Sequence, residues 1–170
     1  MRYITDTDTI DLLETIIDSF HTEGKSCVGL PLGNLTSQLL VNIYMNEFDQ
    51  FVKHKLKVRY YIRYTDDFVF LSEDRQELEK LLPLVSRFLQ EKLKLSLHPD
   101  KVFIKTLASG VDFLGWVHFP YHRVLRTVTK RRMMKRIKEI NGAPETMQSY
   151  RGLLKHGNTY LIQRRIDIIV

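Results

Sequence analysis

Hydrophobic side chains recur at helical spacing in three segments of the first hundred residues. A stripe over residues 8–20 predicts a first helix with Thr7 as its cap. Longer patterns over residues 36–55 and 72–94 predict two more helices, and Pro83 predicts a kink or the start of a separate helix. The expected core positions are Ile10, Leu13, Ile17, Phe20, Leu39, Leu40, Ile43, Phe48, Phe51, Val52, Leu78, Leu81, Leu82, Val85, Phe88, Leu89 and Leu93.

Strand-forming residues occupy shorter segments between these helices. Residues 59–64 and 68–71 flank Thr65-Asp66-Asp67, so we expect a β-hairpin with an aspartate pair at its tip. Residues 21–35 contain three glycines and a proline, which predicts a loop.

The pattern after the third helix changes to short alternating runs. Residues 95–106 predict one or two short strands around a turn at residues 98–100. Residues 111–125 alternate weakly and predict a second hairpin with its turn near residues 120–122.

From Val128 to the end of the chain the hydrophobic pattern is helical, with breaks at residues 142–144 and 157–158. These breaks predict three short basic helices. The predicted fold class is therefore α+β, with an α+β domain over residues 1–126 and a small helical domain over residues 127–170.

Length and composition exclude several classes of protein. The chain has 170 residues, of which 44% are hydrophobic and 27% charged, as in one ordinary globular domain rather than a disordered or low-complexity chain. No apolar run approaches the roughly 20 residues of a membrane span, and the N-terminus lacks the apolar core of a signal peptide. The single cysteine, Cys27, cannot form an internal disulfide. We therefore expect a cytoplasmic protein with no membrane partner.

Charge is distributed unevenly along the chain. Residues 1–100 contain 12 basic and 16 acidic side chains, whereas residues 101–170 contain 14 basic and 4 acidic ones. Residues 113–138 include no acidic side chain. This asymmetry fits either a polyanionic partner for the C-terminal part or a basic helix whose charges face solvent.

Asp66 and Asp67 are the first candidates for chemistry. Neighbouring side chains on a strand point to opposite faces, so only a tight turn lets two adjacent carboxylates reach one site. Two close carboxylates repel unless a cation neutralises them, and Mg²⁺ prefers oxygen ligands of this kind. The pair predicts a divalent-cation site, and the alternative is an ordinary aspartate-rich turn.

Three further motifs are weaker on their own. Residues 29–38 form a glycine-rich loop that leads into a helix capped by Thr36 or Ser37, which either favours a bound phosphate or is a plain helix start. Residues 110–116 combine aromatic side chains with glycine, as in a strand approached by nucleic acid or one packed on a core. Residues 122–136 alternate basic and apolar side chains, which fits a phosphate-binding face or a solvated one.

The order of these motifs resembles that of a reverse transcriptase over about residues 11–166. The resemblance implies the C-terminal part of a right-hand polymerase palm, an antiparallel sheet with helices, followed by a helical thumb. Tyr64-Thr65-Asp66-Asp67 matches the catalytic hairpin of the family, and residues 32–38 match the loop that touches the template and the incoming nucleotide. Residues 113–116 match the primer grip, and Lys101 stands where the family has a basic residue near the nucleotide phosphates.

The resemblance implies a role for each candidate residue. Asp66 and Asp67 would hold two Mg²⁺ ions, for which Mn²⁺ could substitute, and Lys101 would contact phosphate or protonate pyrophosphate. The implied contacts with nucleotide and template come from Leu32, Gly33, Asn34, Ser37, Gln38 and Tyr64. The implied contacts with the primer end come from Phe113, Leu114, Gly115 and Trp116. The implied contacts with the nucleic-acid backbone come from Arg123, Arg126, Lys130, Arg131, Lys135 and Arg136.

The implied function is RNA-directed DNA polymerase activity, a nucleotidyl transfer that uses an RNA template, a DNA or RNA primer and deoxynucleoside triphosphates. Leu32-Gly33 and Ser37-Gln38 stand where most bacterial members have Gln-Gly and Ser-Pro. This difference resembles the error-prone enzymes of diversity-generating retroelements, which implies a bacterial or phage-encoded chain and a basic accessory protein. A group II intron or retron type is the alternative.

One feature departs from the family pattern, which uses three carboxylates with the first on a strand well upstream of the glycine loop. Only 28 residues precede Gly29, and they predict helix and loop, so their aspartates are expected to be cap or helix-surface residues. We therefore expect the fingers and the first carboxylate to be absent and Met1 to begin an internal or truncated form. This makes a non-catalytic nucleic-acid-binding fragment or subunit the alternative function. The aspartates concerned are Asp6, Asp8, Asp11 and Asp18.

Overall fold

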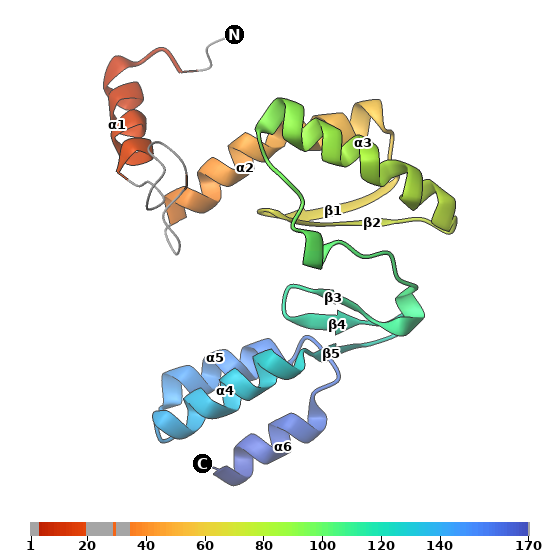
Figure 1. Ribbon diagram of the computed structural model, residues 1–170. Coiled ribbons are helices and arrows are strands. Elements are labelled where there is room, and N and C mark those ends of the chain that lie inside the picture. The colour runs from red at the N-terminus through yellow and green to blue at the C-terminus, as the bar shows by residue number, and fades with distance from the viewer. Residues whose placement is uncertain (1–3, 20–28, 30–34, 170) are drawn as a thin grey trace. The chain divides into compact units, whose positions relative to one another are not determined.

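The computed structural model describes residues 4–19, 29 and 35–169, and the chain divides into two compact units, residues 1–100 and 101–170 (Figure 1). Helices combine with two small antiparallel sheets in the described part of the chain, which confirms the predicted α+β class. The sheet that follows residue 110 belongs to the same unit as the C-terminal helices. The division into palm and thumb near residue 127 is a functional boundary and stays a prediction.

The first helix, α1, spans Thr7–Asp18. Its N-cap is Asp6 and not Thr7 as predicted: the Asp6 carboxylate accepts hydrogen bonds from the Thr9 amide at 2.8 Å and from the Thr9 hydroxyl. The negative charge of Asp6 also complements the helix dipole, which favours it over a neutral cap. The predicted core stripe of this helix is wrong for its described residues, because α1 buries none of them.

Helix α2 spans Leu35–Gln50 and continues as one turn of π-helix over Phe51–Lys55. Thr36 and Ser37 lie inside its first turn, so the predicted cap positions are wrong. Two of its predicted core residues, Phe48 and Val52, are fully buried, but two others, Leu39 and Ile43, are mostly exposed. Among the described residues, the C-terminal half of α2 contributes the buried apolar side chains, Met45 and Phe48, which pack against the helix Arg75–Leu93, labelled α3 in Figure 1, and against the first hairpin.

Strands β1, Tyr60–Tyr64, and β2, Asp67–Leu71, form the predicted hairpin. They pair antiparallel with Tyr64 opposite Asp67, which leaves Thr65 and Asp66 as a two-residue turn. Alternate side chains of the hairpin, including Phe68, pack against α2 and α3 on one face.

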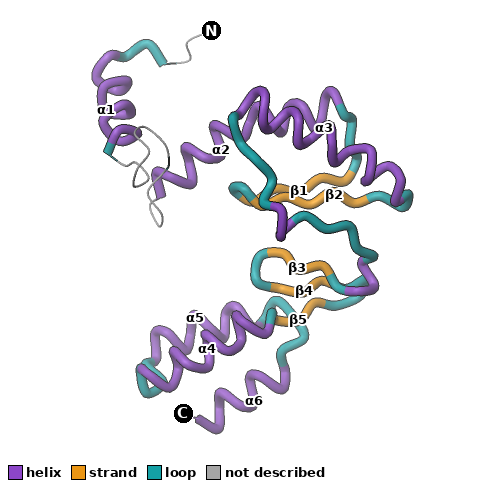
Figure 2. The backbone as a smooth tube through the Cα atoms, in the orientation of Figure 1, coloured by secondary structure: helices purple, strands orange, loops and turns teal. Residues whose placement is uncertain are grey.

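Helix α3 spans Arg75–Leu93 and begins at the N-cap Asp74, whose side chain accepts a hydrogen bond from the Gln76 amide at 2.8 Å. The helix continues through Pro83, so the separate helix that Pro83 suggested does not form. Apolar packing on the C-terminal side of Pro83 holds the helix together. Figure 2 shows α2 and α3 over the same side of the hairpin, where the core consists of Met45, Phe48, Val52, Val85, Leu89 and Leu93.

Two short 3₁₀-helices, Pro99–Lys101 and Leu107–Ser109, lie in or beside the segment predicted to form strands over residues 95–106. That strand prediction is wrong. A strand requires a hydrogen-bonded neighbour, and within the described residues no strand pairs with this segment.

The second unit contains a three-stranded antiparallel sheet in the order β3, Val111–Phe113, β4, Trp116–His118, and β5, Arg123–Leu125. The predicted hairpin is β4–β5, and its turn is closed by a 2.9 Å hydrogen bond from the Phe119 amide to the His122 carbonyl. The turn between β3 and β4 was not predicted.

Three helices follow the sheet, as predicted: α4, Thr127–Glu139, α5, Pro144–Leu154, and α6, Tyr160–Ile169. No helix in the described part of the chain is long and apolar enough to cross a membrane. The three helices pack with the sheet around one core, formed by Trp116, Leu125, Met133, Ile137, Met147, Leu154, Ile162 and Ile166.

Candidate functional site

Two carboxylates lie at the tip of the first hairpin. Asp66 occupies the two-residue turn and Asp67 is the first residue of β2, and both side chains are exposed. The Thr65 hydroxyl lies 2.9 Å from Asp66 Oδ1. Among the ion pairs of the described residues, none includes Asp66 or Asp67. The pair is thus open to a cation.

The ligand chemistry of this tip fits Mg²⁺, which proteins commonly hold through one or two carboxylates together with substrate phosphates. The described residues contain no group of three or more His, Cys, Asp and Glu side chains that could hold a metal ion. Asp66 and Asp67 therefore offer two accessible carboxylate ligands to a metal ion, but they do not form a complete metal site by themselves.

Behind the turn lies an ion pair that the sequence analysis missed. Arg63 on β1 donates two hydrogen bonds to the Asp49 carboxylate of α2, and Tyr61 donates a third at 2.7 Å. The bond from Arg63 is the main reason that the pKa of Asp49 lies below its usual value. Burial and the neighbouring Asp49 raise the pKa of Tyr61. The sequence feature that could have indicated this ion pair is Arg63 itself, a charged residue at an inward-facing position of the predicted strand.

Only three of the six predicted nucleotide and template residues lie within the described part of the chain. Leu32, Gly33 and Asn34 lie outside the described residues. Ser37 is buried and Gln38 is exposed in the first turn of α2, and Tyr64 at the end of β1 is about half exposed. Of these side chains, Tyr64 stands nearest in sequence to the aspartate pair.

Lys101 ends the 3₁₀-helix Pro99–Lys101 and is the first residue of the second unit. Its side chain is exposed. It makes no ion pair among the described residues. Its amine is thus open to an anion.

The four residues matched to a primer grip form the hairpin between β3 and β4. Phe113 pairs with Trp116 across the strands, and Leu114 and Gly115 both have positive φ, which is the signature of a type I′ turn. Leu114 is 46% exposed, whereas Trp116 is only 5% exposed and belongs to the core of the second unit. The turn is therefore the part of this motif that a ligand can reach.

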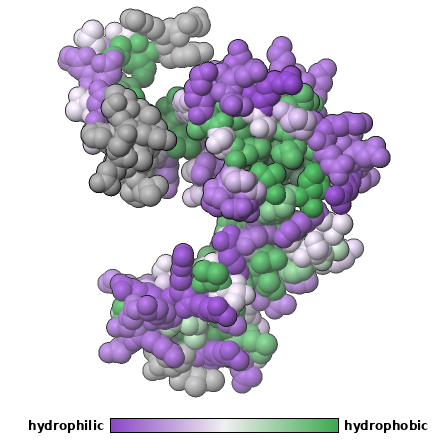
Figure 3. Space-filling view, in the orientation of Figure 1, coloured by the Kyte–Doolittle hydropathy of each residue, from purple (hydrophilic) through white to green (hydrophobic). Residues whose placement is uncertain are grey.

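Four of the six predicted backbone-binding residues lie on α4, where Arg131, Lys135 and Arg136 are exposed and Lys130 is half-buried. Lys130, Arg131 and Lys135 line an open groove with Lys138 and Met134, and Figure 3 shows mainly hydrophilic residues over this part of the molecule. Glu139 lies within 4 Å of Lys135 and Arg136.

The other two predicted residues have partners within the protein. Arg126 donates hydrogen bonds to the Asp112 carboxylate. Arg123 donates to the His156 carbonyl and lies over the Trp116 ring. These contacts leave Arg123 and Arg126 less free for phosphate than the lysines and arginines of α4.

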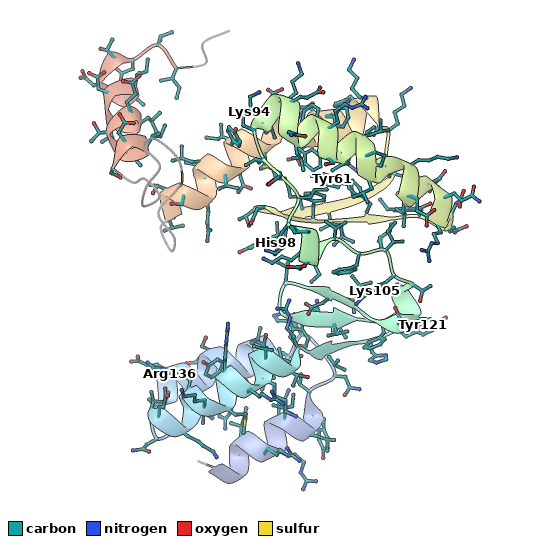
Figure 4. All side chains as sticks on the ribbon, viewed as in Figure 1. Tyr61, Lys94, His98, Lys105, Tyr121 and Arg136 are labelled. Carbon is teal, nitrogen blue, oxygen red and sulfur yellow. The ribbon has the colours of Figure 1, made fainter. Side chains whose placement is uncertain are left out.

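An open cleft beside Arg123 was not predicted from the sequence. It lies between the β4–β5 turn and the loop that joins α5 to α6, and Tyr121 projects from that turn almost fully exposed (Figure 4). The side chains around the cleft include no carboxylate. They are His118, Phe119, Tyr121, His122, Arg123, Lys155, His156 and Asn158.

The aspartates before the glycine-rich loop have the structural roles expected of them. Asp6 caps α1, and the hydrogen bonds from Thr9 lower the pKa of its carboxyl. Asp8, Asp11 and Asp18 are exposed residues of α1. These four side chains belong to the cap and surface of a helix and not to a strand.

The chain is similar in sequence to known proteins. A family profile described as "Reverse transcriptase (RNA-dependent DNA polymerase)" matches residues 5–118. Protein YkfC of Escherichia coli is 28% identical over 74% of this chain. A protein of Saccharomyces cerevisiae described as a COX1/OXI3 intron 2 protein is 21% identical over 71% of this chain.

These relatives are longer than the present sequence. The matched regions correspond to 41% of the Escherichia coli protein and 22% of the yeast protein. The family match begins before α1 and ends at the last residue of β4, so it includes both hairpins that carry candidate residues.

Proposed function

The chain belongs to the reverse transcriptase family of RNA-dependent DNA polymerases, and from this premise we propose that it provides the catalytic aspartates of template-directed DNA synthesis. The observation that supports this most directly is the hairpin that presents Asp66 in a two-residue turn and Asp67 beside it, both exposed. The proposed substrates are an RNA template, a DNA or RNA primer and deoxynucleoside triphosphates.

Asp66 and Asp67 are the residues that would hold Mg²⁺, with Mn²⁺ as a substitute. When bound, two such ions activate the primer 3′-hydroxyl and stabilise the charge on the departing pyrophosphate. The contribution of the chain is to hold two oxygen ligands at an exposed tip, with the hairpin anchored on α2 and α3. Lys101 would offset phosphate charge or give a proton to the pyrophosphate.

The proposed nucleotide and template contacts come from the segment before α2, from the first turn of α2 and from the end of β1. Gln38 and Tyr64 are exposed and suited to polar or stacking contacts, and Ser37 lies one residue before Gln38. The other members of this proposed set are Leu32, Gly33 and Asn34.

The proposed primer contact is the β3–β4 turn. Leu114 and Gly115 offer an exposed turn that a nucleic-acid backbone can approach, while Phe113 and Trp116 hold the turn on the sheet. The basic face of α4 would meet the phosphates of the duplex, with Arg123 and Arg126 at its N-terminal side.

The proposed subtype is the error-prone enzyme of a diversity-generating retroelement, because Leu32 stands where most bacterial members have glutamine. A leucine cannot make the amide hydrogen bonds that a glutamine could offer to the template–nucleotide pair. An accessory protein of basic character and a bacterial or phage origin belong to this proposal. The yeast relative is named as an intron protein, which makes an intron-type enzyme the alternative.

Replacement of the leucine tests the subtype. Leu32→Gln is expected to lower the frequency of errors opposite template adenine, because the amide adds hydrogen bonds that discriminate between nucleotides. Sequencing of the products made on an adenine-containing RNA would measure this frequency. An unchanged error spectrum would count against the role of Leu32.

Primer extension on an RNA template tests the function itself. We expect Mg²⁺-dependent extension that Asp66→Asn reduces by on the order of 10³-fold or more, because a metal ligand is lost. Asp18→Asn is the matched control, since Asp18 is an exposed aspartate of α1. Equal loss of extension in both variants would contradict a catalytic role for Asp66.

A non-catalytic nucleic-acid-binding protein is the second candidate. The observation in its favour is that no third carboxylate accompanies Asp66 and Asp67 as a metal-binding group among the described residues. RNA binding without any nucleotide incorporation, unchanged by Asp66→Asn apart from the effect of charge, would establish this second function in place of the first.

A further inference from the structure

The inner face of the first hairpin contains a side chain that breaks its hydrophobic pattern. The side chains of β1 alternate, so that Tyr60, Ile62 and Tyr64 are exposed while Tyr61 and Arg63 turn toward the helices. The Arg63 side chain is only 10% exposed. A guanidinium at such a position is costly unless its donors are paired, so its partners indicate its purpose.

The first partner of Arg63 is Asp49 on α2. Arg63 Nε lies 2.8 Å from Asp49 Oδ1, and Arg63 Nη2 lies 2.5 Å from Asp49 Oδ2. This two-point contact fixes the plane of the guanidinium. The hydroxyl of Tyr61 donates to the same carboxylate, and Figure 4 shows Tyr61 between the hairpin and the helices.

The remaining nitrogen of Arg63 reaches the catalytic turn. Nη1 donates to the Thr65 carbonyl at 2.6 Å and to the Asn42 side-chain oxygen at 3.0 Å. All three nitrogens of the guanidinium therefore donate hydrogen bonds, and two of the three acceptor residues, Asn42 and Asp49, belong to α2. Through Arg63, the backbone of the turn is tied to a helix and not only to its own strands.

The tied residue has a strained backbone. Thr65 has φ +53°, in the left-handed region that a β-branched residue rarely adopts. Such a conformation persists only where surrounding contacts hold it in place. The carbonyl that Arg63 binds is that of Thr65 itself, immediately before Asp66.

We propose that Arg63 is a positioning residue that locks the Thr65-Asp66 turn onto α2 and so presents the Asp66 carboxylate to the metal ion in one orientation. Arg63 touches neither metal nor substrate, and Asp49 and Asn42 orient its guanidinium. The proposal rests on the proposed function of Asp66 and Asp67 as metal ligands.

The test is a Mn²⁺ titration of the full chain. The readout is the paramagnetic broadening of the backbone amide NMR signals of residues 65–67, which gives the half-saturating Mn²⁺ concentration. Arg63→Lys keeps the positive charge but cannot reproduce the planar set of hydrogen bonds. We expect it to raise the half-saturating Mn²⁺ concentration by about 10-fold or more, as losing a group that orients a metal ligand does. Arg59→Lys is the matched control, because Arg59 lies on the exposed approach to β1 and is expected to leave that concentration unchanged.

A purely structural role for Arg63 would lower the fraction of folded protein without moving the half-saturating concentration of the folded fraction. Asn42→Ala is the milder variant, since it removes one acceptor and leaves the pair of Arg63 and Asp49 intact. Asn42→Ala is expected to raise the half-saturating Mn²⁺ concentration by a smaller factor. If Arg63→Lys does not fold, the result for Asn42→Ala tests the positioning role of Arg63. A folded variant that titrates like the wild type would overturn the role of Arg63.

Failure of the proposed function has a different result. If the wild-type amides do not broaden, or if Asp66→Asn broadens as the wild type does, then Asp66 is no metal ligand and both proposals fall. If the wild type and Asp66→Asn differ but Arg63→Lys and Asn42→Ala match the wild type, only the positioning role falls.

Discussion

Asp49 makes the stability of the first unit depend on pH. Its pKa lies below the usual value, first because Arg63 donates a hydrogen bond to it, and burial opposes this effect only in part. A carboxyl with a lowered folded-state pKa stabilises the fold at a pH above its unfolded value near 4. That stabilisation is lost as the pH falls through the folded-state pKa.

Asp49→Asn is expected to lower the free energy of unfolding by about 1–2 kcal/mol at pH 7, since it removes charge-assisted hydrogen bonds of a partly exposed carboxylate. The difference from the wild type should shrink as the pH falls below about 4, because the carboxyl of the unfolded wild-type chain then takes up a proton while the folded-state carboxyl, whose pKa is lower, still carries its charge. Urea unfolding followed by circular dichroism at several pH values measures both effects. An equal difference at pH 7 and pH 2.5 would contradict this account, and Asp18→Asn serves as control.

Arg63 also shows which site residues a sequence can reveal. The Asp66-Asp67 pair was found because adjacent carboxylates in a turn are a local pattern. Arg63, Asn42 and Asp49 were not found, because their meaning arises from contacts between residues 14 to 21 positions apart. Only an arginine at an inward strand position hinted at them.

Among the helices and strands, those with local sequence signals were predicted correctly, and those that depend on long-range contacts were not. Turn residues and helical periodicity predicted the first hairpin and the three C-terminal helices, because those signals act within a few residues. The strands expected over residues 95–106 do not form, since pairing depends on a neighbour elsewhere in the chain. Pro83 did not divide α3, because tertiary packing outweighs a single lost backbone hydrogen bond.

The contact between the α5–α6 loop and the second sheet gives a prediction at the scale of elements. A Cβ on Gly157 would overlap the Trp116 ring and lie 2.9 Å from the Arg123 carbonyl. Gly157→Ala is therefore expected to lower the free energy of unfolding by about 1–3 kcal/mol. The fluorescence of Trp116, the single tryptophan, reports the transition.

Gly152→Ala is the matched control for this prediction. Gly152 lies within α5, and a Cβ there would meet nothing within 4 Å. This change should stabilise the helix by about 0.5–1 kcal/mol, because alanine loses less conformational freedom than glycine. Equal effects of the two substitutions would show that the loop does not pack as described.

At the scale of the whole molecule, the uneven distribution of charge along the sequence coincides with the division into two units. The excess of basic side chains belongs to the second unit, where α4 alone contains Lys130, Arg131, Arg132, Lys135, Arg136 and Lys138. The first unit is acidic by composition and contains the proposed metal ligands. Affinity for nucleic acid should therefore depend mainly on the second unit.

Replacement of three basic residues of the α4 groove tests this division. The triple change Lys130→Ala, Arg131→Ala and Lys135→Ala should weaken binding to single-stranded RNA and reduce the slope of log affinity against log salt by about 2, at about 0.7 per lost contact. Fluorescence anisotropy at several salt concentrations measures this slope. The control is Lys80→Ala, Arg87→Ala and Lys92→Ala on α3, and a similar reduction in the control would show that only net charge matters.

By itself, the sequence determined the α+β class, most helices, both predicted hairpins and the motif order that resembles the reverse transcriptases. These properties follow from periodicity, turn chemistry and spacing, which are local. Tertiary structure alone decided that Phe48 is buried while Leu39 is exposed, that Trp116 belongs to a core, and that Arg63 ties the Thr65-Asp66 turn to α2. Burial and long-range hydrogen bonds depend on which elements pack together, and no local pattern contains that information.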